Sequence, residues 1–440
     1  MQGSARKLMF VRDPVLGSLK LSGIQEDLLK TVEVQRLSFV HQLGTTFQCY
    51  PGAHGMRLSH ALGVSALASR ICRAVVPGAD APGVCMETNL LEAAGMLHDI
   101  GHTPWSHTLE PVFMELEGRD HMDLVAELVT GERRLGIKGA GRIPSILEAH
   151  GLNPRDVADL IRSRYEGPRF LQQIIFGEVD ADMLDYLQRD FYFTGVAFGH
   201  IEVERIISTM VLAGDRLAFL AKGLDAVRDF LIARLQMYSS VYLHKKTRIV
   251  DQMLMRAARR SIVELREIAC FNELTDDELL SFLATRSGDP WVRDMAWRVK
   301  YRQDLFTQVF RIDATAPSGG RDRFVKFLMG MGSNPGEIAS RLEGEIAARA
   351  GAGPGLVFVD LPLEAVKVSE ERFEKVGIEF LDESGRTRTL AEMDPPFSEY
   401  LAAARPNRSL LTVSCSPEIS ERVSAVCAGM FKEAVTPLFP

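Results

Sequence analysis

The chain has 440 residues, of which 46% are hydrophobic and 25% are charged, the usage of ordinary soluble globular domains. This composition excludes a largely disordered, collagen-like or low-complexity protein, and the length allows about two or three domains. The 51 basic and 58 acidic residues give a net charge of −7, which argues against a protein that mainly coats nucleic acid.

The start of the chain, MQGSARKLMFVRDP, lacks the apolar stretch of a secretory signal, and no uninterrupted apolar run is long enough to cross a bilayer. We therefore expect a cytoplasmic protein with no membrane partner. The six cysteines form no C-x-x-C pair, so neither a zinc ribbon nor a disulfide framework is predicted. All ten histidines fall between His41 and His244, so we expect any imidazole chemistry in that part of the chain.

From about residue 24 to residue 310, apolar residues recur at three- and four-residue spacing between short Gly/Pro interruptions. This periodicity predicts an α-helical domain. The expected helices cover residues 58–76, 88–99, 121–130, 144–164, 178–192, 201–213, 225–262 and 275–285.

The last part of the chain has a different pattern. A Gly/Ser/Pro-rich stretch at 314–322 precedes two more helical patterns, and strand-like segments then follow at 355–361, 377–390 and 409–415, with a closing helix at 417–431. We therefore predict a mainly α protein with a helical domain over residues 1–313. Residues 314–440 are predicted to form a helical linker and a smaller C-terminal α+β lobe.

Residues 90–107, LLEAAGMLHDIGHTPWSH, carry the main chemical signal, because an apolar helix runs into His98 and Asp99 just before a Gly/Pro break. A buried carboxylate is costly unless it is paired or binds a metal, and adjacent imidazole and carboxylate groups suit Fe, Mn, Zn or Mg. The dipeptide alone also fits a capped helix end.

His60 lies on the apolar stripe of residues 57–75, either as a core histidine or as a buried neutral ligand.

The helix predicted at residues 178–193 carries polar side chains at helical spacing on one face. These are Asp182, Tyr186, Arg189 and Asp190. They fit a solvated face with an i,i+4 pair, but a tyrosine beside aspartate and arginine on an otherwise apolar helix favours a cleft.

A later helix, residues 233–246, places Arg234, Tyr238 and Tyr242 four residues apart. Arginine can bind a phosphate with two hydrogen bonds, and tyrosine offers a ring for stacking and a hydroxyl for a sugar. Aromatic packing next to a basic helix end is an equally good interpretation of this segment alone.

Four segments in this order, YPGAHGMRLSHALGV, LLEAAGMLHDIGHTPWSH, VDADMLDYLQRD and VYLHKK, resemble the HD-domain phosphohydrolases. The similarity is greatest to the deoxynucleoside triphosphate triphosphohydrolase branch and covers about residues 8–310. RDPVLGSLKL, VEVQRLSFVHQLG, FNELTDDELLSFL and YRQDLF also look like that branch. The resemblance implies a helical HD core.

The resemblance also implies a set of site residues and a cofactor. It assigns the metal ligands to His60, His98, Asp99 and Asp182, around one divalent transition metal (Mn, Fe, Zn or Ni) with room for additional Mg. It assigns the catalytic roles to His102, Glu110 and His121. The implied phosphate contacts are Arg57, His107, Tyr186 and Arg234, and the implied deoxyribose contacts are Gln42, Leu43, Asp190 and Tyr242. Tyr238 is a further predicted substrate contact.

In that family, water attacks the α-phosphorus and releases a deoxynucleoside and intact triphosphate. We expect the same reaction here, with a carboxylate such as Glu110 favouring the imidazolium form of His102 that protonates the departing 5′ oxygen. A nucleotide substrate and a homo-oligomer, dimer or tetramer, are implied as partners.

Two departures from the family pattern matter. Met183 follows the predicted ligand Asp182 where the family usually has Lys or Arg, so one phosphate contact is missing. Lys30 and Ser38 stand where members activated by a second nucleotide carry Asp and Arg, so activation of that type is not expected.

Two alternatives stay open at this point. The chain could be an HD phosphohydrolase that acts on a monophosphate, a guanosine polyphosphate or a cyclic dinucleotide. It could instead be a regulator with a relic HD core that binds nucleotide or, weakly, single-stranded nucleic acid. Basic residues that fit the regulator are Arg155, Arg162, Arg164 and Arg169, although such residues more often form a solvated helix face.

Overall fold

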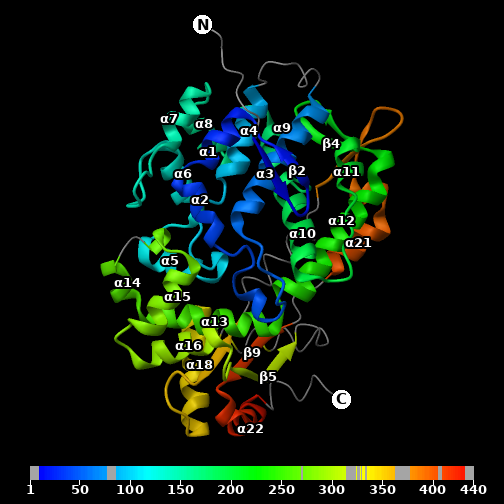
Figure 1. Ribbon diagram of the computed structural model, residues 1–440. Coiled ribbons are helices and arrows are strands. Elements are labelled where there is room, and N and C mark those ends of the chain that lie inside the picture. The colour runs from blue at the N-terminus through cyan, green and yellow to red at the C-terminus, as the bar shows by residue number, and fades with distance from the viewer. Residues whose placement is uncertain are drawn as a thin grey trace.

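The computed structural model describes residues 9–76, 86–268, 271–313, 324, 328, 330–331, 334–361, 377–404 and 409–431. Most of these residues are helical, as Figure 1 shows, which confirms the prediction of a mainly α protein with a smaller α+β part. The stretch predicted as a linker at 314–322, together with Cys85 and Cys270, lies outside the described residues. None of the described helices has the length and apolarity needed to cross a bilayer.

The helices before residue 302 form one packed body. They are α1 (Gly23–Leu29), α2 (Val32–Arg36), α3 (Arg57–Val75), α4 (Met86–Leu97), α5 (Glu110–Glu117), α6 (His121–Thr130), α7 (Ile143–Ala149), α8 (Pro154–Ile161), α9 (Arg169–Ile175), α10 (Ala181–Thr194), α11 (Val203–Thr209), α12 (Leu224–Met237), α13 (Lys245–Arg260), α14 (Ile262–Ile268), α15 (Asp276–Thr285) and α16 (Pro290–Tyr301). They bury one continuous apolar core.

Helices α3 and α4 lie side by side in the middle of this body, and α10 packs against α3. Gly95 of α4 explains how closely the two helices approach, because a Cβ at this position would lie 2.7 Å from the Cα of Ser65 in α3. His60 follows the first turn of α3, and His98 follows the last turn of α4. This close packing of α3 and α4 thus lies next to the histidines that the sequence singled out.

Two short hairpins interrupt the helices and were not predicted. Strands β1 (Phe10–Asp13) and β2 (Gly17–Lys20) pair with each other, and β3 (Met210–Ala213) pairs with β4 (Arg216–Leu220). Residues 201–213, predicted as helix, therefore end as a strand. Each of these strands has four or five residues, too few to show a period against a helical background.

Two predicted helices are divided. Residues 144–164 form α7 and α8, because Asn153 caps the second helix and Pro154 occupies its first position. Residues 225–262 form α12 and α13, joined by a π-helix, η5 (Tyr238–Tyr242), in which the amide of Leu243 donates to the carbonyl of Tyr238.

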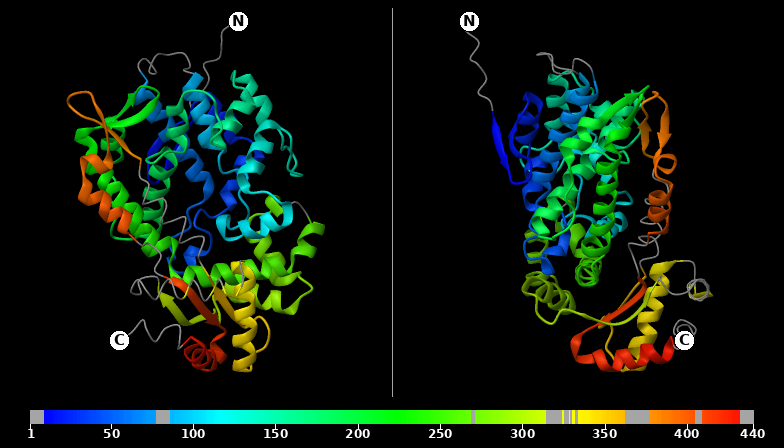
Figure 2. Two further views of the ribbon diagram at one scale, coloured as in Figure 1. Left: turned by 180° about the vertical axis from the view of Figure 1, so that it is seen from behind. Right: turned by 90° about the vertical axis from the view of Figure 1, so that its right-hand side faces the viewer.

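The C-terminal part contributes to two sheets (Figure 2). Strands β5 (Thr307–Asp313), β9 (Ser409–Cys415) and β6 (Val357–Asp360) form an antiparallel sheet in the order β5-β9-β6. This sheet shares a separate apolar core with α18 (Pro335–Ala350) and α22 (Ser420–Met430). The strands and closing helix predicted beyond residue 355 are confirmed.

The predicted hairpin at 377–390 belongs elsewhere. Strands β7 (Glu379–Leu381) and β8 (Thr387–Thr389) extend the β3-β4 hairpin, and Phe219 faces Phe380 in parallel pairing. The short helices α20 (Leu390–Met393) and α21 (Pro395–Ala403) follow on the same side. The division at residue 314 stays a prediction; β5, which ends before it, already joins the sheet of the C-terminal lobe.

Candidate metal centre and active site

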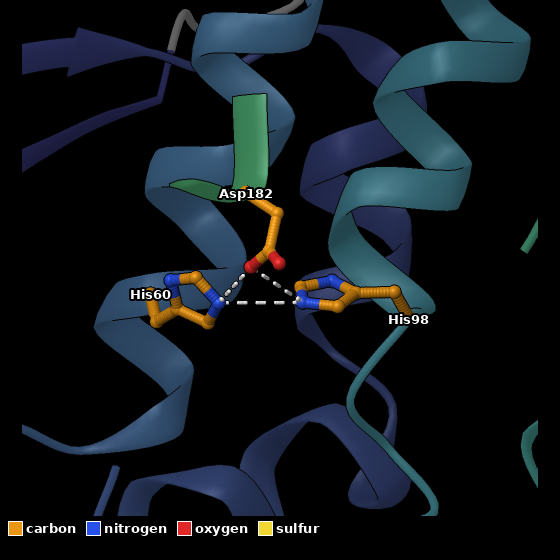
Figure 3. A group of neighbouring side chains, drawn as sticks. All are labelled: His60, His98 and Asp182. Atoms are coloured by element: carbon orange, nitrogen blue, oxygen red, sulfur yellow. Dashed lines mark hydrogen bonds and ion pairs between the residues drawn. The ribbon is translucent and has the colours of Figure 1, made fainter. Parts of the chain in front are cut away.

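Three predicted ligands from α3, the end of α4 and α10 converge in the interior (Figure 3). Asp182 Oδ1 lies 2.9 Å from His60 Nε2 and 3.7 Å from His98 Nε2, and the two imidazole nitrogens are 3.3 Å apart. Both histidines are buried, whereas the Asp182 side chain is 25% exposed. The cluster is therefore open on the aspartate side.

Local hydrogen bonds orient both imidazoles. His98 Nδ1 lies 2.9 Å from the carbonyl of Gly95 one turn earlier, and His60 Nδ1 lies 2.8 Å from Asp185 Oδ2. A histidine that donates from Nδ1 presents the lone pair of Nε2, which is the arrangement found around protein-bound metals. Two imidazoles and a carboxylate, oriented in this way, fit a divalent transition metal.

Asp180, two residues before the ligand, has another role. Its carboxylate accepts from the amide of Met183 at 2.6 Å and so caps the N-terminus of α10. The choice of Asp182 rather than Asp180 as the ligand candidate agrees with this geometry.

Asp99, predicted as the fourth ligand, lies between the cluster and His102. Its Oδ1 is 3.2 Å from His98 Nε2 and 3.2 Å from His102 Nε2, and its Oδ2 is 3.8 Å from His60 Nε2 and pairs with Arg57. Burial alone would raise the pKa of Asp99, but the positive charge of Arg57 and the hydrogen bond with His102 outweigh it and hold the pKa well below its usual value. Asp99 is therefore ionised and connects the metal centre to His102.

Three histidines and Glu110 pack next to Asp99. The ring of His102 stacks on His121 at 4.1 Å and meets the edge of His107 at 4.7 Å. Glu110 pairs with His121 Nδ1 and lies 2.9 Å from His107 Nδ1. His102 Nδ1 is buried and has no hydrogen-bond partner among the described residues. It is thus available to a ligand.

One expectation for this group was wrong. Glu110 contacts His121 and His107 rather than His102, and the pKa of His102 lies well below its usual value because of burial and the nearby charges of Arg57 and His121. Without a ligand, His102 is therefore a neutral imidazole.

Residues predicted to contact the deoxyribose and the phosphates form a second group. The Tyr242 hydroxyl donates to Asp190 Oδ2 at 2.8 Å, and the Tyr242 ring lies edge to face with Tyr186 and Tyr238. Burial raises the pKa of Asp190 to about 7, although the Tyr242 hydrogen bond and His60 lower it. Buried Arg234 lies near the two other tyrosines, whose proximity raises its pKa against the effect of burial.

Gln42 and Leu43 lie in the loop before η2 (Gly44–Gln48) and are partly buried. Gln42 Oε1 has no hydrogen-bond partner in the described part of the chain, although it is shielded from solvent. An unsatisfied buried carbonyl is costly, so a ligand contact at this position is consistent with the structure.

Two arginines that the sequence singled out are already paired with carboxylates. Arg57 donates to Asp99 and to Ser106 Oγ, so its charge is already compensated next to the metal centre. Arg189 is completely buried between Asp185 and Asp13 and does not line a cleft. The helical spacing predicted which face of the helix carries Arg189, but it did not predict that Arg189 forms ion pairs with Asp185 and Asp13.

Two carboxylates were missed. Asp185 holds His60, and its only sequence signal is the i,i+4 relation to Arg189. Asp276, the first residue of α15, accepts from the amide and Nδ1 of His41 at 2.8 and 2.7 Å and from the amide of Trp105 at 2.6 Å. It is far from both partners in sequence, so no local pattern could identify it.

A cavity of about 520 Å³ lies away from the metal cluster, between η5 and α13 on one side and the C-terminal sheet on the other. Basic side chains on its walls include Lys245, Arg248 and Arg311. Arg248 pairs with Asp360 through two hydrogen bonds of 2.8 and 2.9 Å.

Comparisons with known proteins agree with this geometry. Residues 57–190 match the HD domain family, and residues 201–433 match the HD associated region. An uncharacterized protein of Bacillus subtilis, YwfO, is 36% identical over 235 residues, 53% of this chain and 51% of that protein. The human deoxynucleoside triphosphate triphosphohydrolase SAMHD1 is 25% identical over 355 residues, 70% of this chain and 55% of that protein. The chain thus spans about half the length of the curated relatives it matches.

Two solved structures share the fold. A hypothetical protein from Aquifex aeolicus superposes with a TM-score of 0.70 at 24% identity, covering 96% of this chain and all of that one. A phosphohydrolase from Bacteroides thetaiotaomicron superposes with a TM-score of 0.69 at 23% identity, covering 93% of this chain and 99% of that one. The chain therefore belongs to the HD-domain phosphohydrolase family, in the branch similar to the deoxynucleoside triphosphate triphosphohydrolases.

Proposed function

We propose that this chain is a metal-dependent phosphohydrolase that converts deoxynucleoside triphosphates to deoxynucleosides and inorganic triphosphate. One observation carries the proposal: Asp99 contacts both the cation-binding cluster and His102, which stacks on the His121–Glu110 pair. Positive charge and a proton carrier thus lie side by side, and phosphoryl transfer needs both.

The cluster of His60, His98 and Asp182 would hold the cation, with Asp99 beside it. When bound, a divalent cation supplies positive charge to phosphate oxygens and activates water. The two imidazoles need no reorientation to bind a cation, because the Nδ1 atom of His60 and that of His98 already have hydrogen-bond partners.

Protons would reach the site through the histidine group. His107 is exposed, and Glu110 links it to His121 by hydrogen bonds. His102 stacks on His121 without a hydrogen bond to it, so the last transfer to His102 would pass through water. A bound triphosphate adds negative charge near His102 and so raises its pKa from the low value of the ligand-free protein. The protonated imidazole then gives its proton to the departing 5′ oxygen, while water supplies the new oxygen on the α-phosphorus.

The tyrosine group would receive the nucleoside. Tyr242 is fixed by its hydrogen bond to Asp190, so its ring cannot move aside easily to admit a larger sugar. This supports the expectation that deoxyribose is preferred to ribose. Arg234, near Tyr186 and Tyr238, would contact the phosphates.

Product analysis tests the proposal. The purified protein is incubated with each dNTP and NTP in the presence of Mn²⁺, Mg²⁺ or Fe²⁺, and the products are separated by chromatography. Deoxynucleoside and inorganic triphosphate in equal amounts are expected. Pyrophosphate or orthophosphate would contradict the bond assignment, and turnover of a monophosphate, guanosine polyphosphate or cyclic dinucleotide alone would contradict the substrate.

A matched pair of variants tests the site. His98→Ala should lose bound metal and more than about 100-fold of the turnover, because a ligand is removed outright. His150→Ala is the control, since His150 also pairs with a carboxylate, Asp27, at 3.0 Å but lies outside the cluster. If the protein binds single-stranded DNA in a salt-dependent way and shows no metal-dependent turnover, the enzyme hypothesis is wrong and the regulator hypothesis is favoured.

The homo-oligomer, dimer or tetramer, is part of the same proposal. Light scattering of the purified chain, with and without nucleotide, measures its mass directly. A monomer under both conditions would contradict the expected assembly without affecting the proposed chemistry.

A further inference from the structure

A buried chain of charged side chains connects the N-terminal hairpin to the metal cluster. Asp13 Oδ2 lies 2.9 Å from Arg189 Nη1, and the other face of Arg189 binds Asp185 through Nε and Nη2, each at 2.8 Å. Asp185 Oδ2 in turn lies 2.8 Å from His60 Nδ1. Asp13, Arg189 and Asp185 are all buried.

Asp185 Oδ2 is shared. It accepts from Arg189 Nε and from His60 Nδ1, so the two donors compete for the same oxygen. Asp13 binds the remaining edge of the guanidinium and takes up part of its positive charge. Without Asp13, Arg189 would neutralise Asp185 more completely, and Asp185 would hold His60 less strongly.

The turn of the hairpin accounts for one oxygen of the buried Asp13, and Arg189 accounts for the other. A two-stranded sheet is marginally stable on its own, and Phe10 at its start is 61% exposed while Asp13 is 4% exposed. Asp13 Oδ1 accepts from the amides of Val15 and Leu16 at 2.9 and 2.8 Å, which closes the hairpin turn. The turn therefore fixes Asp13 and directs its other oxygen to Arg189.

Helix α3 makes room for this connection at Gly63. A Cβ there would lie 1.8 Å from Asp185 Oδ1 and 2.7 Å from Arg189 Nη2. Any side chain at this position would displace the ion pair from the helix that carries His60. The absence of a side chain one turn after His60 is thus required by the Asp185–Arg189 pair.

We infer that Asp13 and Arg189 are positioning residues for the metal centre: they fix the Asp185 carboxylate that orients His60, so the N-terminal hairpin sets the affinity for the cation. The inference rests on the metal centre of the proposed function and not on its substrate. Second-sphere partners of ligand histidines are commonly worth about 10- to 100-fold in metal affinity. Asp13 lies one step further out, so roughly a threefold to tenfold effect is expected from it.

The test is a double-mutant cycle read out by Mn²⁺ binding, with free Mn²⁺ followed by electron paramagnetic resonance. The proteins are the parent, Asp13→Asn, Asp185→Asn and the double variant, all freed of metal first. Asp185→Asn should weaken Mn²⁺ binding about 10- to 100-fold. Asp13→Asn should weaken it roughly threefold to tenfold in the parent and less than about twofold in the Asp185→Asn background, because Asp13 acts through Asp185.

Two further variants separate positioning from a folding defect. Arg12→Gln removes the neighbouring Arg12–Ser18 contact of 3.1 Å on the same hairpin without touching Arg189, and it should bind Mn²⁺ like the parent. Arg189→Lys keeps the charge but loses the two-pronged grip on Asp185, and it should weaken Mn²⁺ binding as Asp13→Asn does. Thermal unfolding of each metal-free variant verifies that it is folded at the temperature of the titration.

Parent-like Mn²⁺ affinity in folded Asp13→Asn and Arg189→Lys would overturn the inference and leave the proposed function intact. An equal loss from Asp13→Asn in both backgrounds would also overturn it, because the effect would then not pass through Asp185. If the parent itself binds no Mn²⁺ or Co²⁺, the metal centre fails and the inference fails with it.

Discussion

The interior around the metal centre holds charged side chains, whereas the interior of the C-terminal lobe is almost entirely apolar. Asp99, Asp185, Arg189 and Asp190 are each at most 4% exposed in the helical body. In the described part of the lobe, the buried polar side chains are Ser414 and Ser416, and the core consists mainly of aliphatic residues such as Leu411 and Val413.

This difference reflects two uses of burial. A buried charge costs several kcal/mol unless it is paired, and a well-packed apolar group of the same size is often the more stable choice. The core of the C-terminal lobe is of this apolar kind. The helical body instead keeps buried charges around the cluster of His60, His98 and Asp182, so its polar interior points to ligand binding rather than to stability.

The largest expected effect comes from removing Asp99. Asp99→Ala leaves the buried guanidinium of Arg57 without its carboxylate, and the free energy of unfolding in urea should fall by about 3–5 kcal/mol. Turnover should be lost as well. The double variant Arg57→Met/Asp99→Leu should regain most of the stability but no turnover; a single variant as stable as the parent would contradict the contrast between the two interiors.

A cavity in the lobe should cost about 2–5 kcal/mol and leave the chemistry untouched. Leu411 on β9 is fully buried in the lobe core, and Leu411→Ala removes only packing. Urea unfolding measures the loss, and Mn²⁺ titration of the folded variant should match that of the parent. Loss of Mn²⁺ binding in folded Leu411→Ala would show that the two regions are not independent.

Asp276→Ala should cost about 1–3 kcal/mol, because the buried amides of His41 and Trp105 lose their acceptor. Trp105 and Ser106 have φ angles of 61° and 55°, a conformation that non-glycine residues adopt only when the surroundings impose it. Ser106 Oγ accepts from Arg57 and donates to the carbonyl of His41. We therefore expect lower turnover at unchanged Mn²⁺ affinity; equal losses of both would contradict a role limited to this loop.

The smallest effect, taken per pH unit, is a pH dependence of stability. Burial raises the pKa of Asp190 to about 7 in the folded chain, so the folded state binds a proton that the unfolded chain releases near pH 4. Stability should be highest below that pH, as far as this group is concerned, and should fall as pH rises through 7, by at most about 1.4 kcal/mol per pH unit. Asp190→Asn should flatten urea-derived stability between pH 5 and 8; an unchanged slope would contradict the assignment.

The parts of this molecule that sequence could predict are those with local signals. His60 on an apolar stripe, His98 and Asp99 at a helix end, and Asp182 four residues before Tyr186 all follow from spacing and from resemblance, and the structure brings His60, His98 and Asp182 together. The helical core and the strands beyond residue 355 follow from periodicity.

The remaining features depend on contacts between distant segments. No pattern near Arg57 reveals that Asp99 already neutralises it, and the i,i+4 relation of Arg189 to Asp185 does not reveal its second partner, Asp13. Asp276 is linked to Trp105 only by the tertiary fold. The β1-β2 hairpin was missed for the same reason, since Asp13 and the turn that it closes are stabilised from α10. The ion pairs of Arg57 and Asp13 and the hydrogen bond of Asp276 join residues that are far apart in the sequence, so a local sequence pattern cannot predict them.

The π-helix at Tyr238–Tyr242 has a consequence for how this protein can tolerate insertions and deletions. A π turn holds one residue more than the α turn that it replaces, and each residue of a helix rotates the following side chains by about 100°. Deleting a single residue here would turn the π turn at the end of α12 into an α turn with better backbone hydrogen bonds, but it would swing Tyr242 away from Asp190. Helix α13 would stay separate, because His244 before it has an extended backbone. If Tyr242 contacts the nucleoside as proposed, selection would preserve the length of this segment as well as its side chains.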